Sequence, residues 1–172
     1  MIGPLDKSKT GRRYILTFKD TFTKWVEAFP IANYTSQTIA RILEREFSPR
    51  HGVPAQLHSD CGTSFKSEVL VDALKQLGCD KIYTPPYNPK SNAVERPHAD
   101  FRKALAAMRT TNKDWEENLP AILFALRSKT NTSTKFSPFF LLHGRHMSTP
   151  LDAIVGSPED AQPQDPFALK SI

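Results

Sequence analysis

Four short stretches of the chain have the pattern and composition of β-strands. Residues 13–18 alternate in polarity and are rich in aromatic and β-branched side chains, which is typical of a strand. Residues 24–29 predict a second strand, and the polar turn at 20–23 would join the two in a hairpin. Shorter strands are expected at 55–59 and 79–84.

Apolar residues at intervals of three and four predict amphipathic helices between and after these strands. Thr35 or Ser36 would cap the first helix, and Gly78 stands where a C-terminal glycine cap of the second belongs. The buried side of the second helix is expected to contain Phe65, Val69, Leu70, Leu74 and Leu77. The predicted helices cover roughly residues 36–48, 64–77, 93–110 and 114–127, with a last short one that starts at Ser137-Pro138.

The order of these elements indicates an α/β fold in one domain. Strands come first and then alternate with helices, which favours a mixed sheet covered by helices. Residues 1–2 are expected to be the end of an earlier strand. Beyond Pro150 the chain becomes rich in proline and poor in apolar residues. We therefore expect a folded domain at 1–152 and a linker or disordered tail at 153–172.

Composition narrows the class of protein. The chain has 172 residues, of which 39% are hydrophobic, and this suits one globular domain. A net charge of +5 favours polyanionic partners, although weakly. No apolar run reaches the ~18 residues of a membrane span, and no leader is indicated, so no membrane partner and no secretion are expected. The two cysteines, Cys61 and Cys79, predict neither a disulfide framework nor structural zinc.

Two acidic residues stand at the ends of predicted elements. Asp60 follows the strand at 55–59, and Glu95 lies near the start of a long helix, after a proline-rich loop. Carboxylates placed in this way could hold Mg²⁺, which prefers oxygen ligands, and metal pairs of this kind serve phosphoryl transfer. The same positions also fit a simple turn at Asp60 and a solvated helix end at Glu95. Spacing alone does not choose between the two interpretations.

Five blocks of sequence follow one another along the chain: IGPLDKSKTGRRYIL (2–16), DTFTKWVEAFP (20–30), HGVPAQLHSDCGTSF (51–65), TPPYNPKSNAVER (84–96) and SPFFLLHGR (137–145). Together they resemble the integrase catalytic core of gypsy-type LTR retrotransposons, which are relatives of retroviral integrases. The resemblance extends from residue 1 to about residue 152. It implies a ribonuclease-H-like fold, in which helices flank a five-stranded mixed sheet whose first strand is truncated here.

The resemblance also implies a chemistry. Such cores are polynucleotidyl transferases that use Mg²⁺ (or Mn²⁺) held by an Asp, Asp, Glu (DDE) set. They process the 3′ ends of the element's DNA and then carry out strand transfer into target DNA. The second aspartate matches Asp60 and the glutamate matches Glu95 as catalytic and metal-binding residues. The expected position of the first aspartate falls one residue ahead of Met1, and neither Asp6 nor Asp20 is expected to replace it.

The absence of the first aspartate from the sequence leaves three accounts open. The gene model could start too late, the element could be decaying, or a host could have kept the fold without its chemistry. Pro97 and Ala99, which follow the Glu95 block, also depart from the family pattern. We therefore expect impaired catalysis by this chain. The alternative function is a catalytically inactive, element-derived module that binds DNA or protein.

The resemblance finally implies DNA contacts and an oligomer. The polar loop before Glu95 is expected to touch DNA ends, and Arg102 remains on roughly the face of the long helix that carries Glu95. The expected partners are the element ends, target DNA and further copies of the chain, in a homodimer or higher oligomer. The expected location is the nucleus by analogy with the family, and otherwise another compartment inside the cell. The DNA-binding candidates are Tyr87, Asn88, Lys90, Ser91, Asn92 and Arg102.

Overall fold

The computed structural model describes residues 1–84, 101–106, 114–150 and 152. The chain divides into two compact units. The first contains residues 1–17 and 28–116, and the second contains residues 18–27 and 117–172. The expected tail at 153–172 lies outside the described residues. The described helices include none that is long and apolar enough to cross a membrane.

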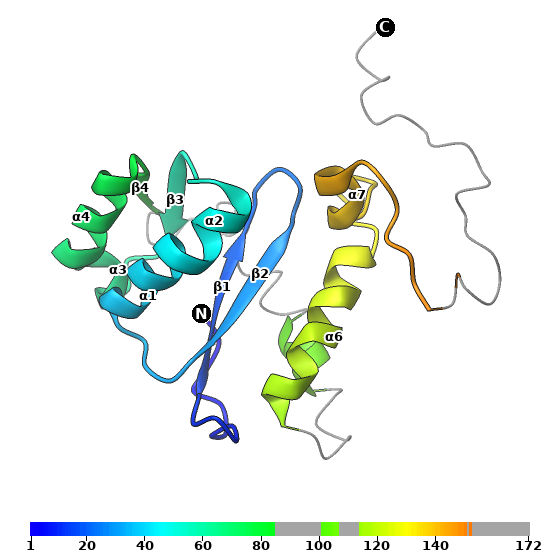
Figure 1. The fold of residues 1–172 in the computed structure, drawn as a ribbon, viewed down its shortest axis with the longest axis horizontal. Helices are drawn as coiled ribbons and strands as arrows, with labels where there is room; N and C mark the ends of the chain where they lie inside the picture. The colour runs from blue at the N-terminus through cyan, green and yellow to red at the C-terminus, as the bar shows by residue number, and fades with distance from the viewer. Residues whose placement is uncertain (85–100, 107–113, 151, 153–172) are drawn as a thin grey trace, which may run out of the picture. The chain divides into compact units, whose positions relative to one another are not determined.

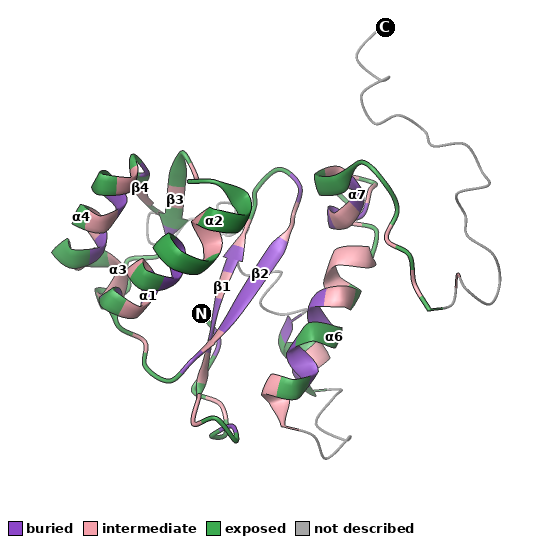
Figure 2. Ribbon diagram, viewed as in Figure 1, coloured by how far each residue is buried: buried purple, intermediate pink, exposed green. Residues whose placement is uncertain are grey.

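The first two strands form the predicted hairpin. β1 (Tyr14–Lys19) pairs with β2 (Val26–Ile31), and the two run side by side in Figure 1. The Asp20 carboxylate closes the turn, because it accepts hydrogen bonds from both the backbone N–H and the hydroxyl of Thr23 at 2.6 Å. Every residue of β2 except Pro30 is buried, as the purple strand in Figure 2 shows. A strand covered on both faces has this nearly continuous burial.

The N-terminal residues continue this sheet, as expected. Ile2 forms an antiparallel bridge with Ile15 through two backbone hydrogen bonds of 3.0 and 2.9 Å. Ile2 is 3% exposed and Ile15 is fully buried, so the bridge is part of the core. The end of the earlier strand predicted at residues 1–2 is therefore present as this bridge.

One continuous helical segment follows the hairpin. It consists of α1 (Ser36–Ile42), the π-helical turn η1 (Leu43–Phe47) and α2 (Ser48–His51). Thr35 caps its start, because its hydroxyl accepts a hydrogen bond from the backbone N–H of Thr38 at 3.3 Å. The helix predicted at 36–48 is confirmed and extends three residues further.

The second pair of strands is parallel and is connected by helices. β3 (Gln56–Ser59) pairs with β4 (Asp80–Tyr83), in a register that places Leu57 beside Lys81 and Ser59 beside Tyr83. Between the two strands the chain forms α3 (Thr63–Lys66) and α4 (Glu68–Leu77). A helical connection is the usual way to join parallel neighbours.

The predicted helix at 64–77 is interrupted at Ser67. This residue has extended backbone angles (φ −62°, ψ 135°), and α4 begins after it. Within α4, Leu70 and Leu74 are buried, whereas Val69 is 46% exposed because it lies more than 90° around the helix axis from Leu74. The assignment of Val69 to the buried side was wrong for this reason. Gly78 ends α4 with a left-handed conformation (φ 75°), as predicted.

The core of the first unit joins these elements. Helices α1 and α4 contact each other, and each contributes its buried aliphatic side chains. Burial of one such side chain contributes roughly 1.5–3 kcal/mol. The described helical residues 101–106, part of the helix predicted at 93–110, add Phe101, which is 1% exposed. The most deeply buried residues of this unit include Ile15, Leu16, Ile39, Ile42, Leu43, Leu70, Leu74 and Phe101.

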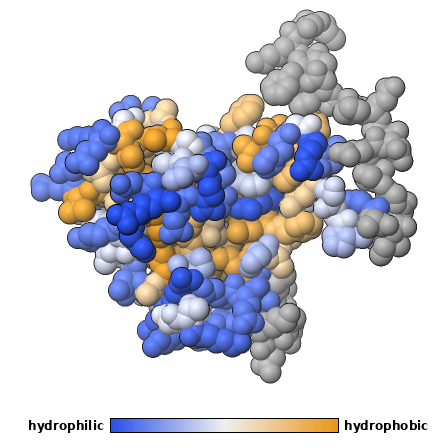
Figure 3. Space-filling view, viewed as in Figure 1, coloured by the Kyte–Doolittle hydropathy of each residue, from blue (hydrophilic) through white to orange (hydrophobic). Residues whose placement is uncertain are grey.

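The outer face of the helical segment is hydrophilic. Blue residues predominate over α1 and α2 in the view of Figure 3. Exposed charges of both signs occupy this face, including Arg41, Glu44, Arg45 and Glu46. Mixed charge of this kind is typical of a solvated helix surface.

The last helices are those predicted. α6 (Trp115–Ser128) carries Pro120 within it, and α7 (Pro138–His143) has proline at its first position. Ser137 caps α7, because its hydroxyl accepts a hydrogen bond from the backbone N–H of Phe140 at 3.1 Å.

A buried ionic cluster holds the second unit together. The Arg127 guanidinium donates to the Val26 carbonyl at 3.1 and 2.8 Å and forms an ion pair with Glu27 at 3.1 Å. It also lies 4.2 Å from the ring centroid of Trp25, whose indole N–H donates to Glu27 at 3.0 Å. Glu27 is only 6% exposed, so the charges meet in a largely water-free environment.

Candidate metal-binding site

Asp60 directly follows β3, as predicted from the sequence. Its side chain is exposed, and its Oδ1 accepts a hydrogen bond from the backbone N–H of Gly62 at 3.0 Å. A β-carbon on Gly62 would lie only 3.0 Å from the same oxygen, so glycine permits this close approach. α3 starts immediately afterwards, at Thr63. The loop thus fixes one carboxylate oxygen of Asp60.

The charge of Asp60 influences the pKa values of two neighbouring side chains, Lys81 and Tyr34. Burial lowers the pKa of Lys81 to about 8, an effect that the negative charge of Asp60 opposes. Burial also raises the pKa of Tyr34 well above its usual range, and the charge of Asp60 adds to that rise. The Tyr34 ring contacts Phe65 edge-on at 5.7 Å, and the Ser64 hydroxyl donates to the Tyr34 carbonyl at 3.1 Å. These contacts connect the loop after β2 to α3.

The Met1 amino group is a third electrostatic neighbour. Burial lowers its pKa, the charge of Asp60 raises it and the charge of Arg102 lowers it. The Ile2–Ile15 bridge fixes the position of this end of the sheet. Met1 therefore lies where its charge interacts with both Asp60 and Arg102.

The structure describes only some of the residues predicted for the site. Glu95 and the loop residues Tyr87, Asn88, Lys90, Ser91 and Asn92 lie outside the described residues. Among the described residues, no group of three or more His, Cys, Asp or Glu side chains could hold a metal ion. Asp20 is the turn residue described above, as expected.

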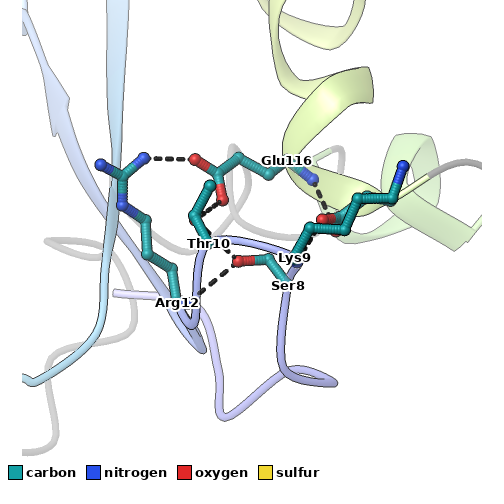
Figure 4. A network of polar contacts seen from close by, with 6 residues as sticks. Ser8, Lys9, Thr10, Arg12 and Glu116 are labelled. Atoms are coloured by element: carbon teal, nitrogen blue, oxygen red, sulfur yellow. Dashed lines mark hydrogen bonds and ion pairs between the residues drawn. The ribbon is translucent and has the colours of Figure 1, made fainter.

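A network of polar contacts joins the N-terminal loop to the start of α6 (Figure 4). Glu116 accepts hydrogen bonds from Thr10 and Arg12, and the Lys9 backbone N–H donates to Asp114 at 2.6 Å. Burial alone would raise the pKa of Glu116, but hydrogen bonds from Thr10, Ser8 and Arg12 and the charge of Arg12 lower it overall.

Arg102 lines a cavity of about 580 Å³ beside this network. The lining combines apolar residues, among them Ile2, Leu5, Leu105 and Trp115, with charged ones such as Lys7 and Asp114. Asp6 also lines this cavity, and its carbonyl accepts a hydrogen bond from the Trp115 indole at 2.8 Å. Asp6 thus contacts the start of α6 through its backbone carbonyl.

The family profile described as "Integrase core domain" matches residues 3–89. The chain belongs to the integrase core domain family. The matched residues include β1 to β4 and Asp60.

Retroviral polyproteins are among the relatives of this integrase core domain. The Gag-Pol polyprotein of Koala retrovirus is 39% identical over 139 residues, which are 78% of this chain and 8% of that protein. The Gag-Pol polyprotein of Avian reticuloendotheliosis virus is 33% identical over 167 residues, which are 96% of this chain and 14% of that protein. The chain thus spans less than a fifth of the length of either polyprotein.

Two solved structures show the same fold. The catalytic core domain of BIV integrase matches with a TM-score of 0.63 and 30% identity, over 74% of this chain and 83% of that one. The simian T-cell lymphotropic virus intasome, solved with PP2A regulatory subunit B56 gamma, matches with a TM-score of 0.66 and 22% identity. That match covers 79% of this chain and 54% of the other. The ribonuclease-H-like α/β fold predicted from the sequence is confirmed.

Sequence reasoning missed several neighbours of Asp60 in this integrase core domain. Lys81 lies beside Leu57 only because β3 and β4 are parallel in one particular register. Tyr34 reaches the site from the loop after β2, and no local motif marks it. A prediction of the strand register could have found Lys81, whereas Tyr34 depends on how the loop packs against α3.

Proposed function

We propose that this chain is the catalytic core of an integrase that inserts an element's DNA into target DNA. The reaction would be metal-dependent phosphoryl transfer, first at the 3′ ends of the element and then at phosphodiesters of the target. The observation that carries the proposal is Asp60, an exposed carboxylate at the end of β3, within a chain that belongs to the integrase core domain family. The blocks shared with gypsy-type elements support an LTR retrotransposon as the source.

Asp60 and Glu95 would hold the divalent cation, Mg²⁺ or Mn²⁺. Asp60 fits this role because its carboxylate is exposed and one oxygen is oriented by the Gly62 N–H at 3.0 Å. Hard cations prefer such carboxylate oxygens and keep several waters. When bound, the cations would neutralise charge on the attacking and leaving oxygens of the transferred phosphate.

A third carboxylate would complete the set from a position directly ahead of Met1. The Met1 amino group is close enough to Asp60 for their charges to interact, so a residue attached there would enter the same surroundings. The stretch from Met1 onward would bind the cation weakly, because two carboxylates attract it less than three. We therefore propose impaired catalysis for this stretch by itself.

Binding of DNA would depend on positive charge around this site. Arg102 lies near Met1, and the chain carries a net charge of +5. Arginine and lysine contacts to phosphates supply most of the affinity for DNA and make it dependent on salt. The loop residues Tyr87, Asn88, Lys90, Ser91 and Asn92 would contact the element ends. We also propose assembly as a homodimer or higher oligomer and action in the nucleus.

A joining assay tests the proposal. An integrase that contains this core and an aspartate ahead of Met1 should join a labelled oligonucleotide to a plasmid when Mg²⁺ or Mn²⁺ is present. Asp60→Asn and Glu95→Gln should abolish joining, whereas Asp72→Asn, on the exposed side of α4, should leave it unchanged. Absence of joining by the unsubstituted protein, or joining that survives Asp60→Asn, would contradict the proposal and favour an inactive binding module.

A further inference from the structure

Lys81 connects β4 to the end of β3 through its side chain. Its ammonium donates hydrogen bonds to the Leu57 carbonyl at 3.4 Å and to the Ser59 hydroxyl. Leu57 is the direct neighbour of Lys81 in the parallel register, and Ser59 follows two residues later on the same face of β3. The lysine therefore reaches along its neighbouring strand toward Asp60.

Ser59 connects Lys81 to Asp60 through its hydroxyl. The Ser59 side chain is buried with the residue at 9% exposure, and its hydroxyl donates to the Asp60 carbonyl at 2.8 Å. A hydroxyl can accept one hydrogen bond and donate another at the same time. Lys81, Ser59 and Asp60 thus form one directional chain of hydrogen bonds, and each bond polarises the next.

Two aromatic rings hold the ammonium in place. Its nitrogen lies 5.1 Å from the ring centroid of Phe65 and 5.1 Å from that of Tyr83, both within cation–π range. The Tyr83 hydroxyl donates to the Phe65 carbonyl at 3.3 Å, which links the Tyr83 side chain to the backbone of Phe65. Phe65 is on α3, after Asp60, so the elements on both sides of the carboxylate converge on one lysine.

A lysine at this half-buried position lowers the stability of the fold unless its charge makes favourable interactions. Desolvation of an ammonium is unfavourable, and an apolar side chain of similar volume often fills such a site with equal or greater stability. Methionine, which has nearly the same length, would pack against the two rings without this penalty. The presence of a lysine at position 81 is therefore better explained by the groups that its ammonium orients through hydrogen bonds than by packing.

We propose that Lys81 is a positioning residue for the metal-binding carboxylate of Asp60. It acts through Ser59, whose hydroxyl fixes the Asp60 backbone and thereby the direction of the side chain. Lys81 itself touches neither metal nor DNA in this role. The inference rests on the proposed function for its consequence in metal binding, but the positioning of Asp60 can be measured independently.

The first arm of the test measures the order of Asp60 by NMR in the full chain. Ser59→Ala and Lys81→Met should shift the carbonyl resonance of Asp60 and lower its backbone order parameter. Ser59→Thr and Lys81→Arg, which keep the hydroxyl and the donors, should restore both. Lys75→Met, at an exposed position of α4, serves as the matched control. An unchanged Asp60 signal in both disruptive variants would overturn the proposal whether or not the protein binds metal.

The second arm measures affinity for Mn²⁺ in the full chain extended by one aspartate ahead of Met1. Ser59→Ala keeps the charge of Lys81 and should weaken Mn²⁺ binding about tenfold, as is usual when a partner of a metal ligand is removed. Ser59→Thr should bind like the unsubstituted protein. A purely structural role would lower the melting temperature of Ser59→Ala and leave Mn²⁺ affinity unchanged, which would contradict the proposal. Failure of the proposed function has another signature, namely Mn²⁺ affinity that Asp60→Asn leaves unaffected.

Discussion

Replacement of Arg127 by methionine tests whether the ionic cluster of the second unit stabilises the fold. Methionine keeps much of the aliphatic length but removes the charge and the donors of the guanidinium. The Val26 carbonyl loses hydrogen bonds of 3.1 and 2.8 Å, and Glu27 loses an ion pair of 3.1 Å. The cation–π contact with Trp25 at 4.2 Å is lost as well.

The expected cost is about 3 kcal/mol. Removal of one partner of a buried ion pair typically costs about 3–5 kcal/mol, because the other charge stays buried. We expect the lower end because the Trp25 indole still donates to Glu27 at 3.0 Å. In a protein of this size the loss corresponds to a decrease of about 10 °C in melting temperature.

Thermal unfolding followed by circular dichroism measures this change. The double variant Arg127→Met with Glu27→Gln should recover part of the loss, since it removes both charges of the ion pair. Glu27→Gln keeps an acceptor for the Trp25 indole, so that contact survives. A decrease below about 3 °C for Arg127→Met, or strictly additive effects in the double variant, would refute the reasoning.

Three further substitutions should give measurable effects. Glu116→Gln should cost about 1 kcal/mol at neutral pH, since the ion pair with the partly exposed Arg12 is screened by solvent. The folded-state pKa of Glu116 is lowered, so its contribution is present above the unfolded-state pKa and is lost as the pH falls below about 4.5. The difference in unfolding free energy between the two proteins should therefore shrink on acidification, and a constant difference in urea titrations would contradict this. Gly3→Ala should destabilise by about 2 kcal/mol or more, because φ is +136° and the added carbon would lie 2.7 Å from the Tyr14 ring; a melting temperature within 2 °C of the parent's would count against it. Ser137→Ala should cost about 1 kcal/mol through the loss of the helix cap, whereas Ser137→Asp should retain most of the stability in the same urea titrations.

Local patterns in the sequence predicted the elements and several of their ends. Alternation located β1, the serine–proline pair located the start of α7, and Gly78 located the end of α4. These features depend on a few adjacent residues, so sequence is sufficient to find them. The position of Asp60 at a strand end was predictable for the same reason, because the short predicted strand at 55–59 precedes it directly.

Errors arose where the chain departs from regular geometry. β2 was predicted two residues too early, because Lys24 takes a left-handed conformation (φ 64°) in the turn and delays the strand. The extended backbone of Ser67 divides α3 from α4, and a single helical pattern could not show this break. The contact of Lys81 with Ser59 depends on the register between strands far apart in sequence. Such features arise from tertiary packing.

Titration of Mn²⁺ into the isotopically labelled chain, extended by one aspartate ahead of Met1, tests the central claim most directly. Paramagnetic Mn²⁺ should first broaden the amide signals of Asp60, Cys61, Gly62 and Ile2, which surround the proposed site. Asp60→Asn should abolish this selective broadening, and the chain without the added aspartate should require a higher Mn²⁺ concentration. If the broadening is centred elsewhere, or if it is unchanged in Asp60→Asn, the proposed metal site at this end of β3 is contradicted.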